Sequence, residues 1–155
     1  MHSQNEKKPR IVVADDHPEV TKTLTKILNA DFELVGCAKN GLEAIGAIAQ
    51  FQPDVLVTDI EMPMMDGIHA ARHLRRINCA VKIVFISASS DTEIAGLAIS
   101  SEASGFVLKS RMATDLVHAI REALAGRQFV SETVDAIVPC SQPWRPSEAT
   151  EAVTR

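Results

Sequence analysis

The stretch that decides the fold is Ile11-Val-Val-Ala-Asp15-Asp16-His17-Pro18, in which four apolar residues lead into two acids and a proline. Near-continuous, β-branched apolar runs are typical of strands covered on both faces, as in a parallel sheet. Proline is favoured at the first position of a helix. Apolar residues then recur with helical spacing at positions 20, 24, 27 and 28. The stretch therefore predicts a buried strand that passes directly into an amphipathic helix.

The same strand-helix unit recurs along the chain. Further apolar runs occupy residues 32–38, 55–57, 82–86 and 105–108, and a helical stripe follows each of them. The second helix begins at the capping sequence Asn40-Gly-Leu-Glu43, the third begins near Asp66, the fourth is short, and the fifth ends at Gly126. The run at 32–38 alternates more than the others, so we expect it nearer a sheet edge. Five such units predict an α/β fold, a doubly wound five-stranded parallel sheet with five helices.

Length, composition and charge indicate one soluble globular domain. The chain has 155 residues, of which 46% are hydrophobic and 23% charged. The formal net charge of −4 argues against a chain whose main function is to bind nucleic acid. Three cysteines, an odd number without a CxxC pair, argue against a disulfide framework or a cysteine zinc site and favour a reducing cytosol.

The ends of the chain differ in composition from its middle. We expect a disordered lead over residues 1–9, a folded domain over 10–127 and a C-terminal extension, linker or tail over 128–155. No apolar run approaches the ~20 residues of a membrane span, and no signal-peptide apolar region follows the polar N-terminus. Trp144 in the extension is interpreted as a residue that folds back onto the domain, with a partner anchor as the alternative.

Polar side chains stand where the predicted strands end. Asp15 and Asp16 follow the first strand, Asp59 the third, Ser87 the fourth and Lys109 the fifth. In such sheets the chemistry lies at the carboxyl ends of the strands. Three neighbouring carboxylates repel one another, and bound Mg²⁺, which prefers oxygen ligands, would relieve that repulsion. A carboxylate beside Mg²⁺, with a lysine and a hydroxyl nearby, can attack phosphorus and form an acyl phosphate.

The segment Asp59-Ile-Glu-Met-Pro-Met-Met-Asp-Gly67, together with the strand-end residues, resembles the receiver domain of two-component response regulators. The resemblance covers about residues 10–126 and implies a flavodoxin-like, CheY-like fold. It implies that Asp59 is the phosphoacceptor. It also implies that Asp15, Asp16 and Asp59 hold Mg²⁺ together with the backbone carbonyl of Glu61.

The same resemblance implies roles for three further residues. Ser87 and Lys109 would contact the phosphoryl oxygens, and Ser87 and Phe106 occupy the switch positions. Ser110 follows Lys109 where many receivers have proline. A cis bond there would cost about 3 kcal/mol, so none is assumed.

The stretch from Leu108 to Gly126 resembles receivers of the LuxR/NarL type, which normally precede a DNA-binding domain. The implied function is a cytoplasmic signalling switch that takes a phosphoryl group from a histidine kinase or histidine phosphotransfer protein, and that catalyses only its own phosphorylation and dephosphorylation. We expect output to a homodimer or an effector through the fourth helix, fifth strand and fifth helix, and no binding of nucleic acid or membrane by this chain alone.

Other interpretations of the same residues remain open. Asp15 and Asp16 could cap a helix, Ser87 could be a loop hydroxyl, and Phe106 could be a core residue. His69 and His73, four apart on a helix, fit a solvated face better than zinc. Three other functions compete with the leading one: a receiver fragment of a LuxR-type transcriptional regulator whose effector domain is absent here, an aspartate-nucleophile phosphatase of the haloacid-dehalogenase type, and a pseudo-receiver that only binds partners.

Overall fold

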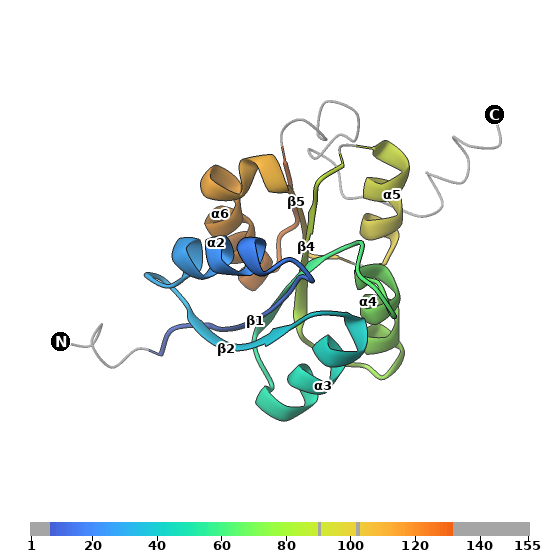
Figure 1. Ribbon diagram of the computed structural model, residues 1–155, viewed down its shortest axis with the longest axis horizontal. Helices are drawn as coiled ribbons and strands as arrows, with labels where there is room; N and C mark the ends of the chain where they lie inside the picture. The colour runs from blue at the N-terminus through green and yellow to red at the C-terminus, as the bar shows by residue number, and fades with distance from the viewer. Residues whose placement is uncertain (1–6, 90, 102, 132–155) are drawn as a thin grey trace.

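The computed structural model describes residues 7–89, 91–101 and 103–131, and its centre is a single parallel β-sheet (Figure 1). The strands are β1 (Arg10–Ala14), β2 (Glu33–Ala38), β3 (Val55–Asp59), β4 (Lys82–Ser87), β5 (Gly105–Leu108) and β6 (Phe129–Val130). The helices are α2 (Pro18–Leu28), α3 (Gly41–Phe51), α4 (Gly67–Arg76), α5 (Thr92–Ser100) and α6 (Met112–Leu124), with a 3₁₀ turn, η1 (Lys109–Arg111), before α6. The five predicted strand-helix units are confirmed.

The strand order β2-β1-β3-β4-β5-β6 is that of a doubly wound sheet. Every pairing is parallel. The strand order reverses between β1 and β3, so the loops after these two strands flank a crevice at the carboxyl edge. Strand β2 lies at one edge of the sheet, as its alternating sequence predicts, and its residues are partly exposed.

Helices cover both faces of the sheet (Figure 1). One face packs against α3, α4 and α5, and its core includes Ile48, Leu74 and Phe106. The other packs against α2 and α6, and its core includes Leu24 and Leu116. Strands β1 and β3 are buried almost throughout, because side chains on both of their faces meet a helical layer. This rigid double layer holds the strand ends in place.

The helix starts follow the predicted capping residues. Pro18 is the first residue of α2. Asn40 Oδ1 accepts a hydrogen bond of 2.9 Å from the backbone N–H of Glu43, and Asp66 caps α4 in the same manner. Gly126 follows α6 with a φ of +84°, a left-handed conformation that glycine adopts without strain.

The sheet has six strands rather than five, because residues 129–130 pair with β5. The domain end expected from the sequence, residue 127, lies two residues before this strand. The short run Phe129–Val130 carries too little periodicity to be recognised as a strand. The predictions for residues 1–6 and 132–155, including Trp144, lie outside the described residues. Among the described helices, none combines the length and apolar character needed to cross a bilayer.

Candidate functional site

Asp15 and Asp59 lie side by side because β1 and β3 are neighbouring parallel strands. Ala14 pairs with Thr58, so the next residue of each strand reaches the same edge. Asp15 is 2% exposed and Asp59 4% exposed. The backbone N–H of Glu61 acts to lower the pKa of the Asp59 carboxyl. Two carboxylates are thus held in a largely buried position, which is costly unless a cation neutralises them.

Lys109 supplies a positive charge between these two carboxylates. It is the first residue of η1, directly after β5. Its Nζ lies 2.9 Å from Asp15 Oδ2 and 3.2 Å from Asp59 Oδ2. Its side chain is 17% exposed, so its charge is only partly screened by solvent. The structure therefore brings together three of the predicted site residues from three different strands.

The pKa values of Asp59 and Lys109 both depart from their ordinary values. Burial and the neighbouring Asp15 charge raise the pKa of Asp59, and Lys109 only partly offsets them. Burial acts to lower the pKa of Lys109, but the hydrogen bond to Asp15 and the charges of Asp59 and Asp15 outweigh it and raise that pKa. The Asp59 carboxylate is consequently destabilised in its charged form, whereas the lysine is held as a cation.

Asp16 and His17 complete an oxygen-rich cluster at this edge. Among the described residues, Asp15, Asp16, His17 and Asp59 form a group whose possible ligand atoms all lie within 4.8 Å of one another. Asp15 Oδ2 and Asp16 Oδ1 are buried; their partners are Lys109 Nζ at 2.9 Å and His17 Nδ1 at 3.2 Å respectively, which leaves each oxygen with further accepting capacity. Carboxylate oxygens of this kind fit a hard divalent cation.

The loop after β3 is held close to the cluster by glycine. The backbone N–H of Gly67 donates to the Ile60 carbonyl at 2.8 Å. A Cβ at Gly67 would overlap the carbonyl oxygen of Asp59. A glycine is therefore required for the start of α4 to pack against the end of β3. Met64 occupies the loop with a φ of +69° and is 80% exposed.

Ser87 and Phe106 are both buried. Ser87 ends β4, and its Oγ accepts a hydrogen bond of 3.1 Å from the Ser89 backbone N–H. Phe106 is fully buried in the core of the sheet, so the side chain is in a core position here. Among the described residues no peptide bond is cis, which makes the Lys109–Ser110 bond trans.

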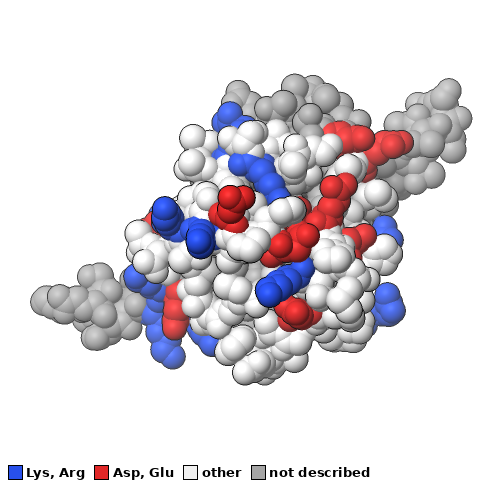
Figure 2. All heavy atoms as spheres, in the orientation of Figure 1, with Lys and Arg blue, Asp and Glu red and all other residues white. Residues whose placement is uncertain are grey.

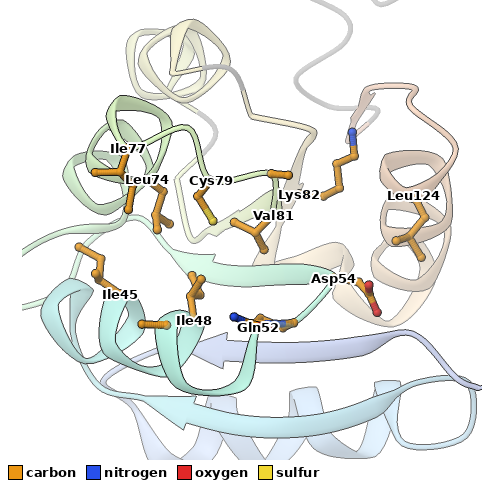
Figure 3. Close-up of a pocket in the computed structure, with 13 residues that line it drawn as sticks. Ile45, Ile48, Gln52, Asp54, Leu74, Ile77, Cys79, Val81, Lys82 and Leu124 are labelled. Carbon is orange, nitrogen blue, oxygen red and sulfur yellow. The ribbon is translucent and has the colours of Figure 1, made fainter.

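Two hollows mark the surface near and far from the cluster. The nearer one is lined by acidic residues, Asp16, Glu61 and Asp66, and by apolar ones, including Ile94 and Leu97. Figure 2 shows a band of acidic side chains across the face seen in Figure 1. The other hollow, of about 520 Å³, lies at the opposite edge of the sheet. Its lining, drawn in Figure 3, is mainly apolar and includes side chains from α3, α4 and α6, with Asp54 and Lys82 as its charged residues.

His17 and Ser131 are not among the site residues predicted from the sequence. His17 Nδ1 lies 3.0 Å from Asp15 Oδ1 and 3.2 Å from Asp16 Oδ1. A histidine next to two acids is a signal that the sequence does contain. Ser131 lies far along the chain from the cluster and carries no such signal; its contacts appear only once β6 is seen beside β5. His69, by contrast, pairs with its own helix cap Asp66 at 2.9 Å and is largely exposed.

A family model described as the response regulator receiver domain matches residues 11–121. The chain belongs to this family. A relative from Mycobacterium tuberculosis named "Probable transcriptional regulatory protein NarL" is 32% identical over 136 residues, which are 86% of this receiver and 63% of that protein. This receiver therefore spans somewhat less than two thirds of the length of that relative.

Solved receiver structures are similar in both sequence and shape. The signal receiver domain of the putative response regulator NarL from Mycobacterium tuberculosis is 33% identical with a TM-score of 0.75, covering 79% of this chain and all (100%) of that one. A LuxR-family response regulator from Aurantimonas sp. is 30% identical with a TM-score of 0.81, covering 95% and 99% of the two chains. The chain is thus a receiver of the NarL/LuxR type, as its sequence indicates.

Proposed function

We propose that this receiver is a phosphoacceptor switch that takes a phosphoryl group onto Asp59. The observation that carries the proposal is the position of Lys109 Nζ, 3.2 Å from Asp59 Oδ2 and 2.9 Å from Asp15 Oδ2. A buried carboxylate beside a lysine at the crevice of a doubly wound sheet is equipped to act as a nucleophile toward phosphorus. The folded unit we propose is residues 10–127, extended by β6.

The transfer joins a carboxylate oxygen of Asp59 to phosphorus. The bond from phosphorus to the histidine nitrogen of a kinase or phosphotransfer protein breaks, and that nitrogen keeps the electron pair. Lys109 loses its pairing with Asp59 and donates to an oxygen of the phosphoryl group, and Ser87 donates to another. The chain alters only its own phosphorylation state in this reaction, so it is not an enzyme acting on external substrates.

The donor atoms of the cluster fit Mg²⁺. Asp15, Asp16, Asp59 and the backbone carbonyl of Glu61 would hold the ion, because hard cations prefer oxygen and the carboxylate oxygens of the cluster lie close together. When bound, Mg²⁺ would neutralise charge on the phosphoryl oxygens. His17, which contacts both carboxylates, would orient Asp15 and Asp16 through its ring nitrogen.

Binding of a phosphoryl group would draw Ser87 and Lys109 toward Asp59 and repack the elements behind them. Those elements are α5, β5 and α6, with Phe106 as the buried switch residue. We propose that this face contacts an effector or a second copy of the chain. The relative from Mycobacterium tuberculosis is named a transcriptional regulatory protein, which supports a cytoplasmic place of action.

The proposal is tested by incubation with acetyl phosphate and Mg²⁺, followed by intact-mass spectrometry. Wild type should gain one phosphoryl group and Asp59→Asn none. The matched control is Asp31→Asn, which alters a surface carboxylate paired with Arg121 and should label as wild type does. Full labelling of Asp59→Asn would refute the assignment. Failure of wild type to label would favour a pseudo-receiver, and steady turnover of an external phosphate ester would favour a phosphatase.

A second candidate concerns the protein to which this receiver belongs. The receiver spans 63% of its NarL relative, and that relative is named a transcriptional regulatory protein. These observations support the alternative that this receiver is one part of a LuxR-type DNA-binding regulator. The length of the natural open reading frame beyond residue 155 tests this candidate directly.

A further inference from the structure

We propose that Ser131 is a positioning residue for Lys109, acting with Asp115 through the turn that carries the lysine. The inference rests on the proposed function, since it assigns the positioning of a group that would contact the phosphoryl oxygens. Ser131 lies ten residues beyond the span 11–121 that the family model matches. It is fully buried, at 0% exposure.

Ser131 is bound to β5 at two points. Its backbone N–H donates to the carbonyl of Phe106 at 2.9 Å. Its Oγ accepts a hydrogen bond of 3.0 Å from the backbone N–H of Leu108. Leu108 is the residue immediately before Lys109, and it pairs with Ser87 of the neighbouring strand β4. The hydroxyl of Ser131 therefore holds the backbone at the point from which the lysine leaves the sheet.

Asp115 closes this network at the other end of the turn. Ser131 Oγ donates to Asp115 Oδ2 at 2.9 Å. The same oxygen accepts from Arg111 Nε at 2.9 Å. The turn η1 spans Lys109–Arg111. Asp115 Oδ2 therefore links Ser131, which is bound to the chain just before the turn, to Arg111 at the end of the turn. The hydrogen bond from Arg111 lowers the pKa of Asp115, against the effect of burial, so this oxygen stays an acceptor at neutral pH.

The physical consequence is restricted motion of the Lys109 backbone. A lysine side chain has several rotatable bonds, so its ammonium reaches one place consistently only if its Cα is fixed. Without the Ser131 hydroxyl, the Leu108 N–H would be left buried without a partner, and Asp115 would lose one of its donors. A shift of the turn would then move Nζ from its position between Asp15 and Asp59. A purely structural role for Ser131 would instead lower stability and leave the reaction unchanged.

The test compares wild type, Ser131→Ala and Ser131→Thr in the full chain, with acetyl phosphate and Mg²⁺ as the phosphodonor system. In Ser131→Ala one hydrogen bond is lost, and acetyl phosphate should label Asp59 about fivefold more slowly than in wild type. Ser131→Thr keeps the hydroxyl and should recover most of the rate. The matched control is Ser101→Ala. Ser101 is another buried serine, and its hydroxyl donates to the carbonyl of Leu97 in α5. This variant should label at the wild-type rate despite a comparable loss of stability.

A double-mutant cycle distinguishes positioning from stability. In a Lys109→Ala background, Ser131→Ala should cause no further loss of rate, because the group that it positions is absent. Equal losses in both backgrounds, or a wild-type rate for Ser131→Ala, would overturn the inference. Asp115→Asn, which keeps an oxygen acceptor for Ser131, serves as a milder variant if Ser131→Ala is poorly folded.

A readout without phosphorylation separates this inference from the proposed function. NMR of the unmodified protein should show displaced Leu108 and Lys109 amide signals, and a displaced Lys109 side-chain signal, in Ser131→Ala but not in Ser101→Ala. If wild type fails to label while these displacements occur, the proposed function fails and the positioning role stands. If wild type labels and the Lys109 signals are unchanged in Ser131→Ala, the positioning role fails alone.

Discussion

The ammonium of Lys109 lies closer to Asp15 than to Asp59, at 2.9 Å from Asp15 Oδ2 against 3.2 Å from Asp59 Oδ2. Asp15 is also contacted by His17, whose backbone N–H donates to its other oxygen at 2.8 Å. In the proposed transfer, Lys109 would keep Asp15 as a partner when it leaves Asp59 for a phosphoryl oxygen. The lysine would then not lose all of its neutralising contacts.

Lys109→Ala should separate labelling from the response to it. We expect acetyl phosphate to label the variant in part, because Asp59 remains, while the conformational change weakens, because a charge-assisted contact specific to the phosphorylated state is lost. Removing the cation from two buried carboxylates should also lower the free energy of unfolding by up to about 3 kcal/mol. NMR shift changes on phosphorylation measure the response, and the exposed Lys22 provides a matched Lys22→Ala control. A wild-type response in Lys109→Ala would contradict the assignment.

Asp59→Asn should stabilise the protein at neutral pH in the presence of a chelator. Burial and the Asp15 charge raise the pKa of Asp59 in the folded state, so the folded protein binds that proton more tightly than the unfolded chain does. The ionised group then lowers stability as pH rises through the two pKa values, and its removal abolishes that loss. Urea unfolding from pH 3 to pH 8 measures the effect. The gain should be largest near neutrality and disappear at the acid end; a gain independent of pH would show that the charge is not its cause.

Asp16→Ala should remove most Mg²⁺ binding. The Asp16 side chain is 30% exposed, which leaves the carboxylate accessible to an ion, and its Oδ1 has only the His17 ring nitrogen as a neighbour at ion-pair distance, 3.2 Å away. Titration calorimetry with MgCl₂ measures the loss, and Asp91→Ala, on an acid that caps α5, controls for the change in net charge. Chelation of Mg²⁺ should slow labelling by acetyl phosphate. Unchanged labelling with chelator present would rule out the metal role.

Gly67→Ala should destabilise the protein by about 1–3 kcal/mol, the usual cost of overpacking. The added methyl would overlap the carbonyl oxygen of Asp59, so either α4 or the end of β3 must move, and labelling should slow as Asp59 is displaced. Gly46→Ala is the matched control, because a Cβ at Gly46 would meet nothing within 4 Å. It should stabilise α3 by about 0.5–1 kcal/mol. Equal effects of the two substitutions would contradict the close-contact argument.

Beryllofluoride, a stable phosphoryl mimic, should change hydrogen exchange mainly over residues 87–125. Ser87 and Lys109 leave β4 and β5, so elements next to these strands repack first, and the mimic shifts the equilibrium by its difference in affinity for the two states. Asp59→Asn with beryllofluoride is the control and should show no change. Changes confined to α2 and α3 would refute this output face. Sequence-specific DNA binding by these 155 residues would contradict the expectation of none.

The sequence by itself determined the order of the strand-helix units and the residues at the strand ends. Asp15, Asp59, Ser87 and Lys109 could be placed at one edge because parallel strands present their carboxyl ends together, a consequence of local patterns and chain direction. The capping residues Asn40 and Asp66 could be predicted equally well, since each bonds to a backbone group three residues away.

The tertiary structure alone decided which of these groups touch and what else holds them. The sharing of Lys109 between Asp15 and Asp59 and the burial of Phe106 depend on the packing of residues that lie far apart in the chain. Strand β6 and Ser131 are the clearest case. The two residues of β6 carry no periodic signal, and the hydrogen bonds of Ser131 to Phe106 and Leu108 exist only because the chain beyond α6 returns to the edge of β5.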